Sequence, residues 1–172
     1  MKPARCFLLL CVSLVLAAQA RALPLPDACG NDKIQFEVKT QKNQPAPAPP
    51  AHGMAQIAFV EKESQPGLPL THATVRFGMD GVWVGADKGN SYFVLDVTTG
   101  THHLCASWQG TKTFELTPFT AEAGKVYYFA AQVTLESQIF GPFVFSQLND
   151  DEGKYRVKAS KLSIAKPQPA QD

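Results

Sequence analysis

The sequence predicts a mainly β fold, an antiparallel β-sandwich with one short helix near the C-terminus. Three observations support this prediction. Short apolar runs recur about every 8–12 residues from Met54 onward, glycine-rich turns separate them, and β-branched or aromatic residues fill them. This pattern is typical of sandwiches of the immunoglobulin-like or prealbumin-like kind.

The first 22 residues have the pattern of a secretory signal peptide. A positive start is followed by an apolar run over 6–16 and by two Ala-x-Ala patterns, at 18–20 and 20–22. The alternative is a retained membrane anchor, but the run is shorter than the roughly 20 residues that a spanning helix needs. We therefore expect cleavage after Ala20 or Ala22, export to the periplasm or beyond, and no membrane span afterwards.

The charge of the chain argues against two classes of partner. The whole sequence carries a net charge of +1, and the first 22 residues contribute Lys2, Arg5 and Arg21 without any acid. The remaining 150 residues therefore hold 13 basic and 15 acidic side chains. This balance excludes a nucleic-acid binder, which needs clustered Lys and Arg, and no basic run could dock on an anionic membrane.

Residues 23–44 are expected to form an N-terminal arm with one strand. Residues 33–39 alternate strictly, with Ile34, Phe36 and Val38 on one face and polar groups on the other. A proline-rich spacer follows at 45–53, and a polyproline-type chain of this kind spans roughly 20 Å. If Cys29 bonds Cys105, the arm folds back and the spacer becomes a strap across one edge of the main domain.

Residues 54–165 are expected to form the sandwich domain. Its predicted strands are 55–60, 73–77, 82–84, 91–97, 101–108, 113–116, 125–135 and 140–145. Asp80-Gly81 suits a tight hairpin turn. The helix is expected over 150–160, with acids at its start and lysines near its end, although Gly153 weakens it. The Pro- and Gln-rich residues 166–172 are expected to be a disordered tail.

Two cysteines, Cys29 and Cys105, remain after cleavage. In an exported protein we expect them to form a disulfide, which would stabilise the fold by about 4 kcal/mol. One alternative is a pair of buried free thiols. Another is a lipid anchor through Cys29, although Pro26 and Asp27 depart from the residues that lipidation favours.

Several short motifs occur in a fixed order in the sandwich domain. They are Asp80-Gly81 with Gly85, Tyr92-Phe93, Gly100-Thr101-His102-His103-Leu104-Cys105, and Ala123-Gly124-Lys125-Val126-Tyr127-Tyr128. This order resembles an exported bacterial family, domain of unknown function 2846, over about residues 54–165. The resemblance implies a small exported β-sandwich, and a subgroup pairs an arm cysteine like Cys29 with the His-His-Leu-Cys strand. It implies no activity, and the nearest alternative is a PEGA-type surface domain.

The sequence shows no catalytic or metal-binding constellation. His102 and His103 are adjacent on a strand and point to opposite faces, so a shared metal ion would need His52 or His72 to approach. No nucleophile elbow, phosphate loop or dinucleotide fingerprint is present. We expect no enzyme activity, no cofactor and no metal. A hydrolase or metalloprotein is the least favoured interpretation.

Aromatic residues suggest a binding surface. If strands 82–84 and 91–97 are neighbours, Trp83 and Tyr92 could lie side by side, next to Asp87 in the polar glycine loop 85–90. The alternative is that both aromatics pack under the Pro-rich arm or a loop. If this aromatic surface is exposed, we expect the chain to be a non-catalytic interaction or structural module of the bacterial envelope. It would dock through that surface on another envelope protein. The alternative function is a carbohydrate or cell-wall-binding module that uses the same aromatics.

Overall fold

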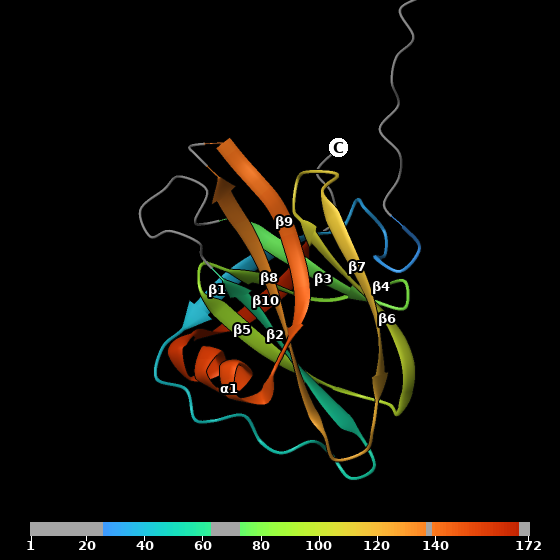
Figure 1. Ribbon diagram of the computed structural model, residues 1–172. Coiled ribbons are helices and arrows are strands. Elements are labelled where there is room, and N and C mark those ends of the chain that lie inside the picture. Colours follow the sequence, from blue (N-terminus) through green and yellow to red (C-terminus); the bar gives the residue numbers. More distant parts are fainter. Residues whose placement is uncertain (1–25, 63–72, 137–138, 169–172) are drawn as a thin grey trace, which may run out of the picture.

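Two β-sheets packed face to face make up most of the computed structural model (Figure 1), which describes residues 26–62, 73–136 and 139–168. The elements in order are β1 (Gln35–Gln41), β2 (Ala55–Lys62), β3 (Thr74–Met79), β4 (Val82–Lys88), β5 (Ser91–Val97), β6 (Gly100–Trp108), β7 (Phe114–Ala121), β8 (Val126–Glu136), β9 (Ile139–Leu148), α1 (Asp150–Ala159) and β10 (Lys161–Gln168). The predicted β-sandwich with one short helix is confirmed.

The larger sheet has the strand order β1-β10-β5-β2-β8-β9, and the smaller has the order β4-β3-β6-β7. All pairs in the smaller sheet are antiparallel. In the larger sheet, β2 runs parallel to β8, and β10 pairs in parallel with β5 only at Lys161 and Leu162. Because β4 and β5 are consecutive in the chain but belong to different sheets, their outer faces point in different directions.

The main core lies between the two sheets. Alternate residues of each strand point inward, and aromatic rings from both sheets meet there. Phe59 of β2 contacts Phe77 of β3 and Phe93 of β5, with ring centroids 4.9 and 5.1 Å apart. Such contacts hold the sheets together by burying large apolar area and by favourable ring geometry.

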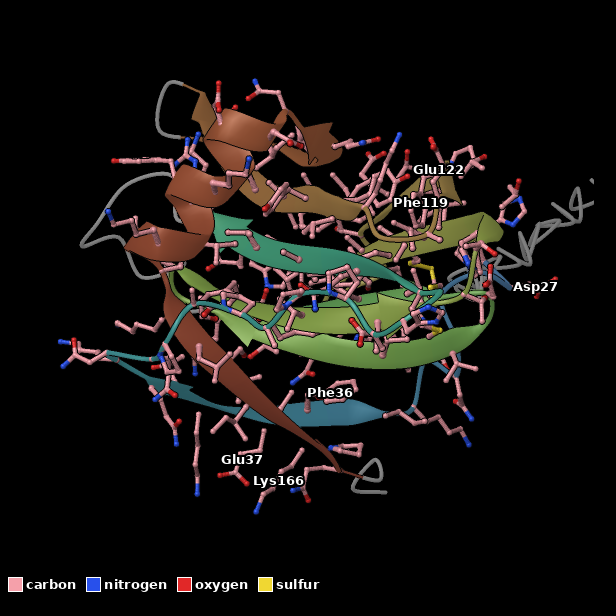
Figure 2. All side chains as sticks on the ribbon, turned by 90° about the horizontal axis from the view of Figure 1, so that it is seen from below. Asp27, Phe36, Glu37, Phe119, Glu122 and Lys166 are labelled. Carbon is pink, nitrogen blue, oxygen red and sulfur yellow. A yellow bond between two sulfur atoms is a disulfide. The ribbon has the colours of Figure 1, made fainter. Side chains whose placement is uncertain are left out.

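A second, smaller core lies on the outer face of the four-stranded sheet. Figure 2 shows β1 and β10 as a ribbon along this face, with Phe36 directed at the sandwich. The buried residues of this cluster are Cys29, Phe36, Trp83, Ala86 and Cys105. The N-terminal arm therefore packs on its own chain, with β1 paired to β10 from Gln35–Gln168 to Gln41–Leu162.

The predicted disulfide is present and joins Cys29 of the arm to Cys105 of β6, with 5.0 Å between the two Cα atoms. Gly78 of β3 leaves room for this link. A Cβ built on Gly78 would lie 2.4 Å from the carbonyl oxygen of Cys29. Only a glycine lets the arm backbone come this close to the sheet.

Two predictions about chain segments are corrected. Residues 166–168, expected in a disordered tail, belong to β10; residues 169–172 lie outside the described part. Pro167 fits this strand because β5 pairs with β10 only at Lys161 and Leu162. On the side of β10 that faces β5, no backbone N–H is therefore needed at Pro167. Residues 85–88, expected in a loop, continue β4, and only Gly89-Asn90 form the turn.

Candidate functional site

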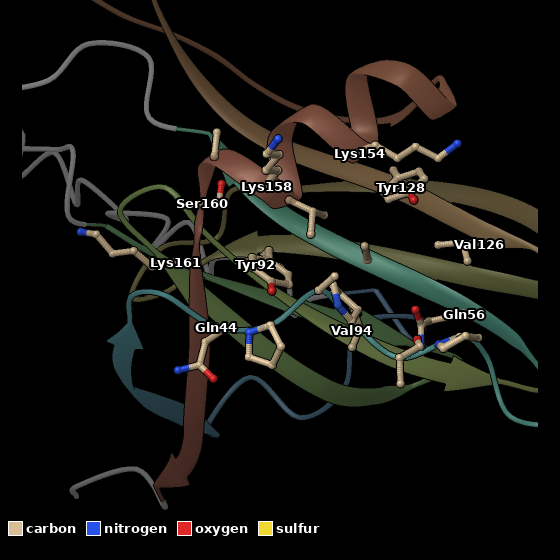
Figure 3. Close-up of a pocket in the computed structure, with 18 of the residues that line it drawn as sticks. Gln44, Gln56, Tyr92, Val94, Val126, Tyr128, Lys154, Lys158, Ser160 and Lys161 are labelled. Carbon is tan, nitrogen blue, oxygen red and sulfur yellow. The ribbon is translucent and has the colours of Figure 1, made fainter.

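A large hollow lies on the outer face of the six-stranded sheet. It is a cavity of about 1020 Å³. Its floor is the sheet, its roof is the proline-rich segment 42–50, here called the strap, and its side wall is the C-terminal half of α1 with the start of β10 (Figure 3). The strap therefore crosses a sheet face and not the sheet edge that the sequence predicted.

Strand register explains why the floor is apolar and concave. Ala58 of β2 lies opposite Val94 of β5 on one side and Tyr128 of β8 on the other. Alternation gives the outer face to these residues and the inner face to their neighbours, such as Phe93 and Phe129. The small side chain in the middle, between two larger ones, makes the hollow.

Hydrogen bonds hold the far end of the strap on the sheet. The Gln56 side-chain amide donates to the Ala48 carbonyl oxygen, at 3.2 Å, and to Oδ1 of Asp96, at 3.0 Å. The backbone N–H of Ala51 donates to Oδ2 of Asp96, at 3.2 Å. Between these bonds and β1 the polyproline-type chain needs few partners, because each proline lacks an N–H. It can therefore bridge the cavity without filling it.

The helix wall is set by two local features. Asn149 caps α1 by accepting a hydrogen bond from the N–H of Glu152, at 3.0 Å. Gly153 rests on the Tyr128 ring, where a Cβ would lie 2.1 Å from Cγ of Tyr128. The glycine that weakened the helix prediction is thus the residue that lets α1 approach the sheet and close the cavity.

The charged groups at the cavity are all cationic. Lys42, Lys154, Lys158 and Lys161 are among its lining residues, and the lining includes no aspartate or glutamate. Lys154 pairs with Asp150 at 3.6 Å; no ion pair joins the other three to any residue that the structure describes. The cavity therefore favours a negatively charged ligand electrostatically.

Two tyrosines add hydroxyl groups to the site. Tyr92 and Tyr128 both lie on the floor (Figure 3), and burial raises the pKa of each phenol, so both stay protonated at neutral pH. Neither hydroxyl has a hydrogen-bond partner within the described ranges. Each can donate to a ligand.

The predicted surface of Trp83, Asp87 and Tyr92 does not exist. Trp83 is only 8% exposed and is covered by the arm; its indole N–H donates to the Asn31 carbonyl oxygen at 2.6 Å. The guanidinium of Arg76 lies 4.4 Å from the Trp83 ring centroid. The alternative, that both aromatics are covered by the arm or a loop, is the better description, because Tyr92 is also buried and lies below the strap in a different sheet.

Asp87 is fully buried on the inner side of β4. Burial raises its pKa well above the ordinary value, and the nearby charge of Glu61 acts in the same direction. Neither carboxyl oxygen has a hydrogen-bond partner among the described residues, and the Ser163 hydroxyl donates to the Ala86 carbonyl oxygen instead. Burial therefore disfavours the charged form of Asp87, and this side chain is not a surface contact residue.

The histidines behave as their alternation predicts. His102 is buried and His103 is exposed, on opposite faces of β6. No cluster of three or more His, Cys, Asp or Glu side chains that could hold a metal ion occurs within the described part of the chain. His72 lies outside those residues. The interpretation of the tandem as one packed and one exposed histidine is confirmed.

Sequence reasoning found Tyr92 but missed the cavity around it. Two features of the sequence point to the parts of the cavity: the alternation of β5 predicts an apolar face, and the proline-rich spacer predicts an extended segment. Strand order, which the sequence does not show, decides that the two meet.

Comparison of the chain with models of known protein families, with curated proteins and with solved structures gives no match. Within the described ranges, no helix is long and apolar enough to cross a membrane.

Proposed function

We propose that this protein is an exported, non-catalytic binding module whose ligand occupies the cavity below the strap. The observation that carries the proposal is the cavity itself, of about 1020 Å³, with an apolar floor and a few convergent polar groups. Ligand sites in proteins have this composition and are commonly of about this size.

Two further features support the proposal. The disulfide between Cys29 and Cys105 fits an oxidising compartment, in agreement with the signal-peptide pattern of the first 22 residues. The cavity lining includes no histidine, cysteine or carboxylate, so the site favours binding over proton transfer or nucleophilic attack. The proposal replaces docking through Trp83, which the arm already covers.

The test is a pair of tryptophan substitutions on the outer face of the larger sheet. Val94→Trp places a large ring on the cavity floor, whereas Val144→Trp adds the same ring on β9, where Val144 is 40% exposed and outside the cavity. The probe is Nile red, a neutral dye that fluoresces in apolar sites. We expect saturable, one-to-one dye binding to the unsubstituted protein and to Val144→Trp, and at least tenfold weaker binding to Val94→Trp. Equal binding to all three proteins, or none to any, would refute a cavity site.

A further inference from the structure

We propose that the ligand of the strap cavity is an amphipathic anion, a single acyl chain that ends in a carboxylate. This inference rests on the proposed function and names the chemical class that the cavity selects. It follows from the way the lining divides into a cationic end and an apolar trough.

The cationic end is fixed by strand pairing. Gln41 lies opposite Leu162 in the β1–β10 ladder. Lys42, the residue just after β1, and Lys161, the first residue of β10, are therefore brought to the same end of the cavity. Lys161 in turn lies opposite Ser91, next to Tyr92 on β5. One end of the cavity therefore has two lysines beside a phenol hydroxyl that is free to donate. The Lys161 side chain points away from Tyr92 (Figure 3), so its ammonium group would have to turn inward to pair with a carboxylate there.

Lys158 also borders this end, but its position in the helix gives another reason for a lysine there. It lies in the last turn of α1, where a cation offsets the helix dipole. That explanation does not extend to Lys42 or Lys161, which lie outside the helix. A smaller cavity of about 470 Å³ shares Ala159 and Lys161 with the strap cavity and adds Lys88, which extends the positive region.

The rest of the cavity is an apolar trough. Ala58, Val94 and Val126 form its floor, and Pro45, Pro47 and Pro49 lie in the strap above them. Val157 adds an apolar side chain from the helix. An acyl chain between floor and strap would replace contacts with water by contacts with hydrocarbon on both sides.

A neutral sugar fits these surroundings less well. Sugars stack on open aromatic faces, but the Tyr128 ring is covered by Gly153 and Tyr92 is only 4% exposed. The aromatic residues offer hydroxyl groups and ring edges and no open platform. Charge and shape therefore favour an acyl carboxylate over the carbohydrate alternative.

The first experiment compares dodecanoate with its methyl ester by titration calorimetry on the disulfide-bonded protein. We expect the carboxylate to bind at least tenfold more tightly than the ester, and its affinity to fall as salt screens the lysines. Lengthening the chain by two methylenes should strengthen binding about tenfold, because each buried methylene contributes about 0.8 kcal/mol. Maltose is the sugar probe, and it should not bind.

The second experiment removes the charges. The double variant Lys42→Gln/Lys161→Gln should bind dodecanoate about tenfold more weakly and Nile red unchanged. The matched control, Lys39→Gln/Lys166→Gln, removes the same charge from β1 and β10 outside the cavity, and should change dodecanoate affinity less than twofold. Both variants replace exposed or half-buried lysines, so their folds should persist.

The outcomes separate the two proposals. Equal affinity for ester and carboxylate, no effect of the Lys42/Lys161 change, or binding of maltose in place of dodecanoate would overturn the acyl-anion inference, while Nile red binding would leave the cavity site standing. If Nile red, ester and carboxylate all fail to bind, both proposals fall.

Discussion

His102 lies between two hydrogen-bond acceptors. Its Nδ1 is 2.7 Å from Oδ2 of Asp80, and its Nε2 is 2.9 Å from the Thr98 carbonyl oxygen. Only the imidazolium can donate from both ring nitrogens. Burial alone would lower the His102 pKa, but the bonds to Asp80 and Thr98 and the Asp80 charge outweigh it, so the pKa is raised.

The first prediction follows from this raised pKa. A group whose pKa is higher in the folded state contributes stability that is complete below its unfolded value, about 6.5 for histidine, and is lost as the pH rises through the folded value. We therefore expect the free energy of unfolding, measured in urea, to fall as the pH rises above about 6.5. His102→Gln should remove most of that slope. His103→Gln is the control and should keep it, because that side chain is 67% exposed; a slope that survives in His102→Gln contradicts the assignment.

Trp83 shows that the sequence predicts on which face of a strand a residue lies, but not whether that face is exposed to solvent. Alternation correctly separates His102 from His103 and Ile34, Phe36 and Val38 from their polar neighbours. It cannot say what covers a face. The outer face of β4 is covered by the arm, which Arg76 holds by donating to the carbonyl oxygens of Asp32 and Ile34.

The second prediction is that Trp83→Ala destabilises the protein by about 3–5 kcal/mol, as is usual when a large buried aromatic is removed. The loss should appear as a lower urea midpoint and as faster amide exchange around Asn31, whose carbonyl oxygen accepts from the indole N–H. Val82→Ala, on the same strand but 64% exposed, is the control and should change little. A mild effect of Trp83→Ala would return the side chain to the surface and restore the docking hypothesis.

At the scale of elements, the helix was predictable and its packing was not. Acids at the start and basic residues at the end of α1 indicate both of its ends, and the helix spans Asp150–Ala159 as expected. Gly153 disfavours a helix by its intrinsic propensity, because a glycine in a helix interior destabilises the helix by about 1 kcal/mol relative to alanine. Its contact with Tyr128 depends on a strand far away in the sequence.

The third prediction reverses the propensity rule. Gly153→Ala should destabilise the protein by about 1–3 kcal/mol, because the added methyl group collides with the Tyr128 ring and pushes α1 outward. The free energy of unfolding measures this effect, and Nile red binding reports the altered cavity wall. A double-mutant cycle with Tyr128→Ala is the control, since removing the ring should turn the alanine into a stabilising substitution. Stabilisation by Gly153→Ala alone would show that the helix does not rest on Tyr128.

The C-terminal strand was missed for a related reason. Residues 161–165 were expected inside the sandwich domain but not as a strand, and Pro167 with its polar neighbours made 166–172 look like a tail. The strand forms by pairing with β1, whose apolar and polar residues alternate clearly. Pairing partners distant in sequence decide such elements, and one sequence alone does not show them.

At the scale of the whole molecule, the disulfide connects the arm to the sandwich. It closes a loop between residues 76 positions apart, and an exported chain with two cysteines made this link predictable. Strap, β1 and arm form one continuous stretch, so the link near its start and the Asp96 bonds near its end fix both the second core and the roof of the cavity.

The fourth prediction concerns this link. Cys29→Ala/Cys105→Ala should lower the free energy of unfolding by about 4 kcal/mol, because the unfolded chain regains the freedom of a long loop. Unfolding in guanidinium with and without reductant measures the change, and the double variant should be insensitive to reductant. Equal stability of the two proteins would mean that contacts such as that of Trp83 with the arm suffice.

Photolabelling tests whether the strap cavity holds the ligand. A dodecanoate that carries a diazirine in mid-chain is bound to the protein and irradiated, and the labelled peptides are mapped by mass spectrometry. We expect label on the strap, on β5 around Val94 and on the C-terminal half of α1. Unmodified dodecanoate should compete with the labelling, and Val94→Trp should abolish it. Label confined to other surfaces, or label that Val94→Trp does not reduce, would contradict it.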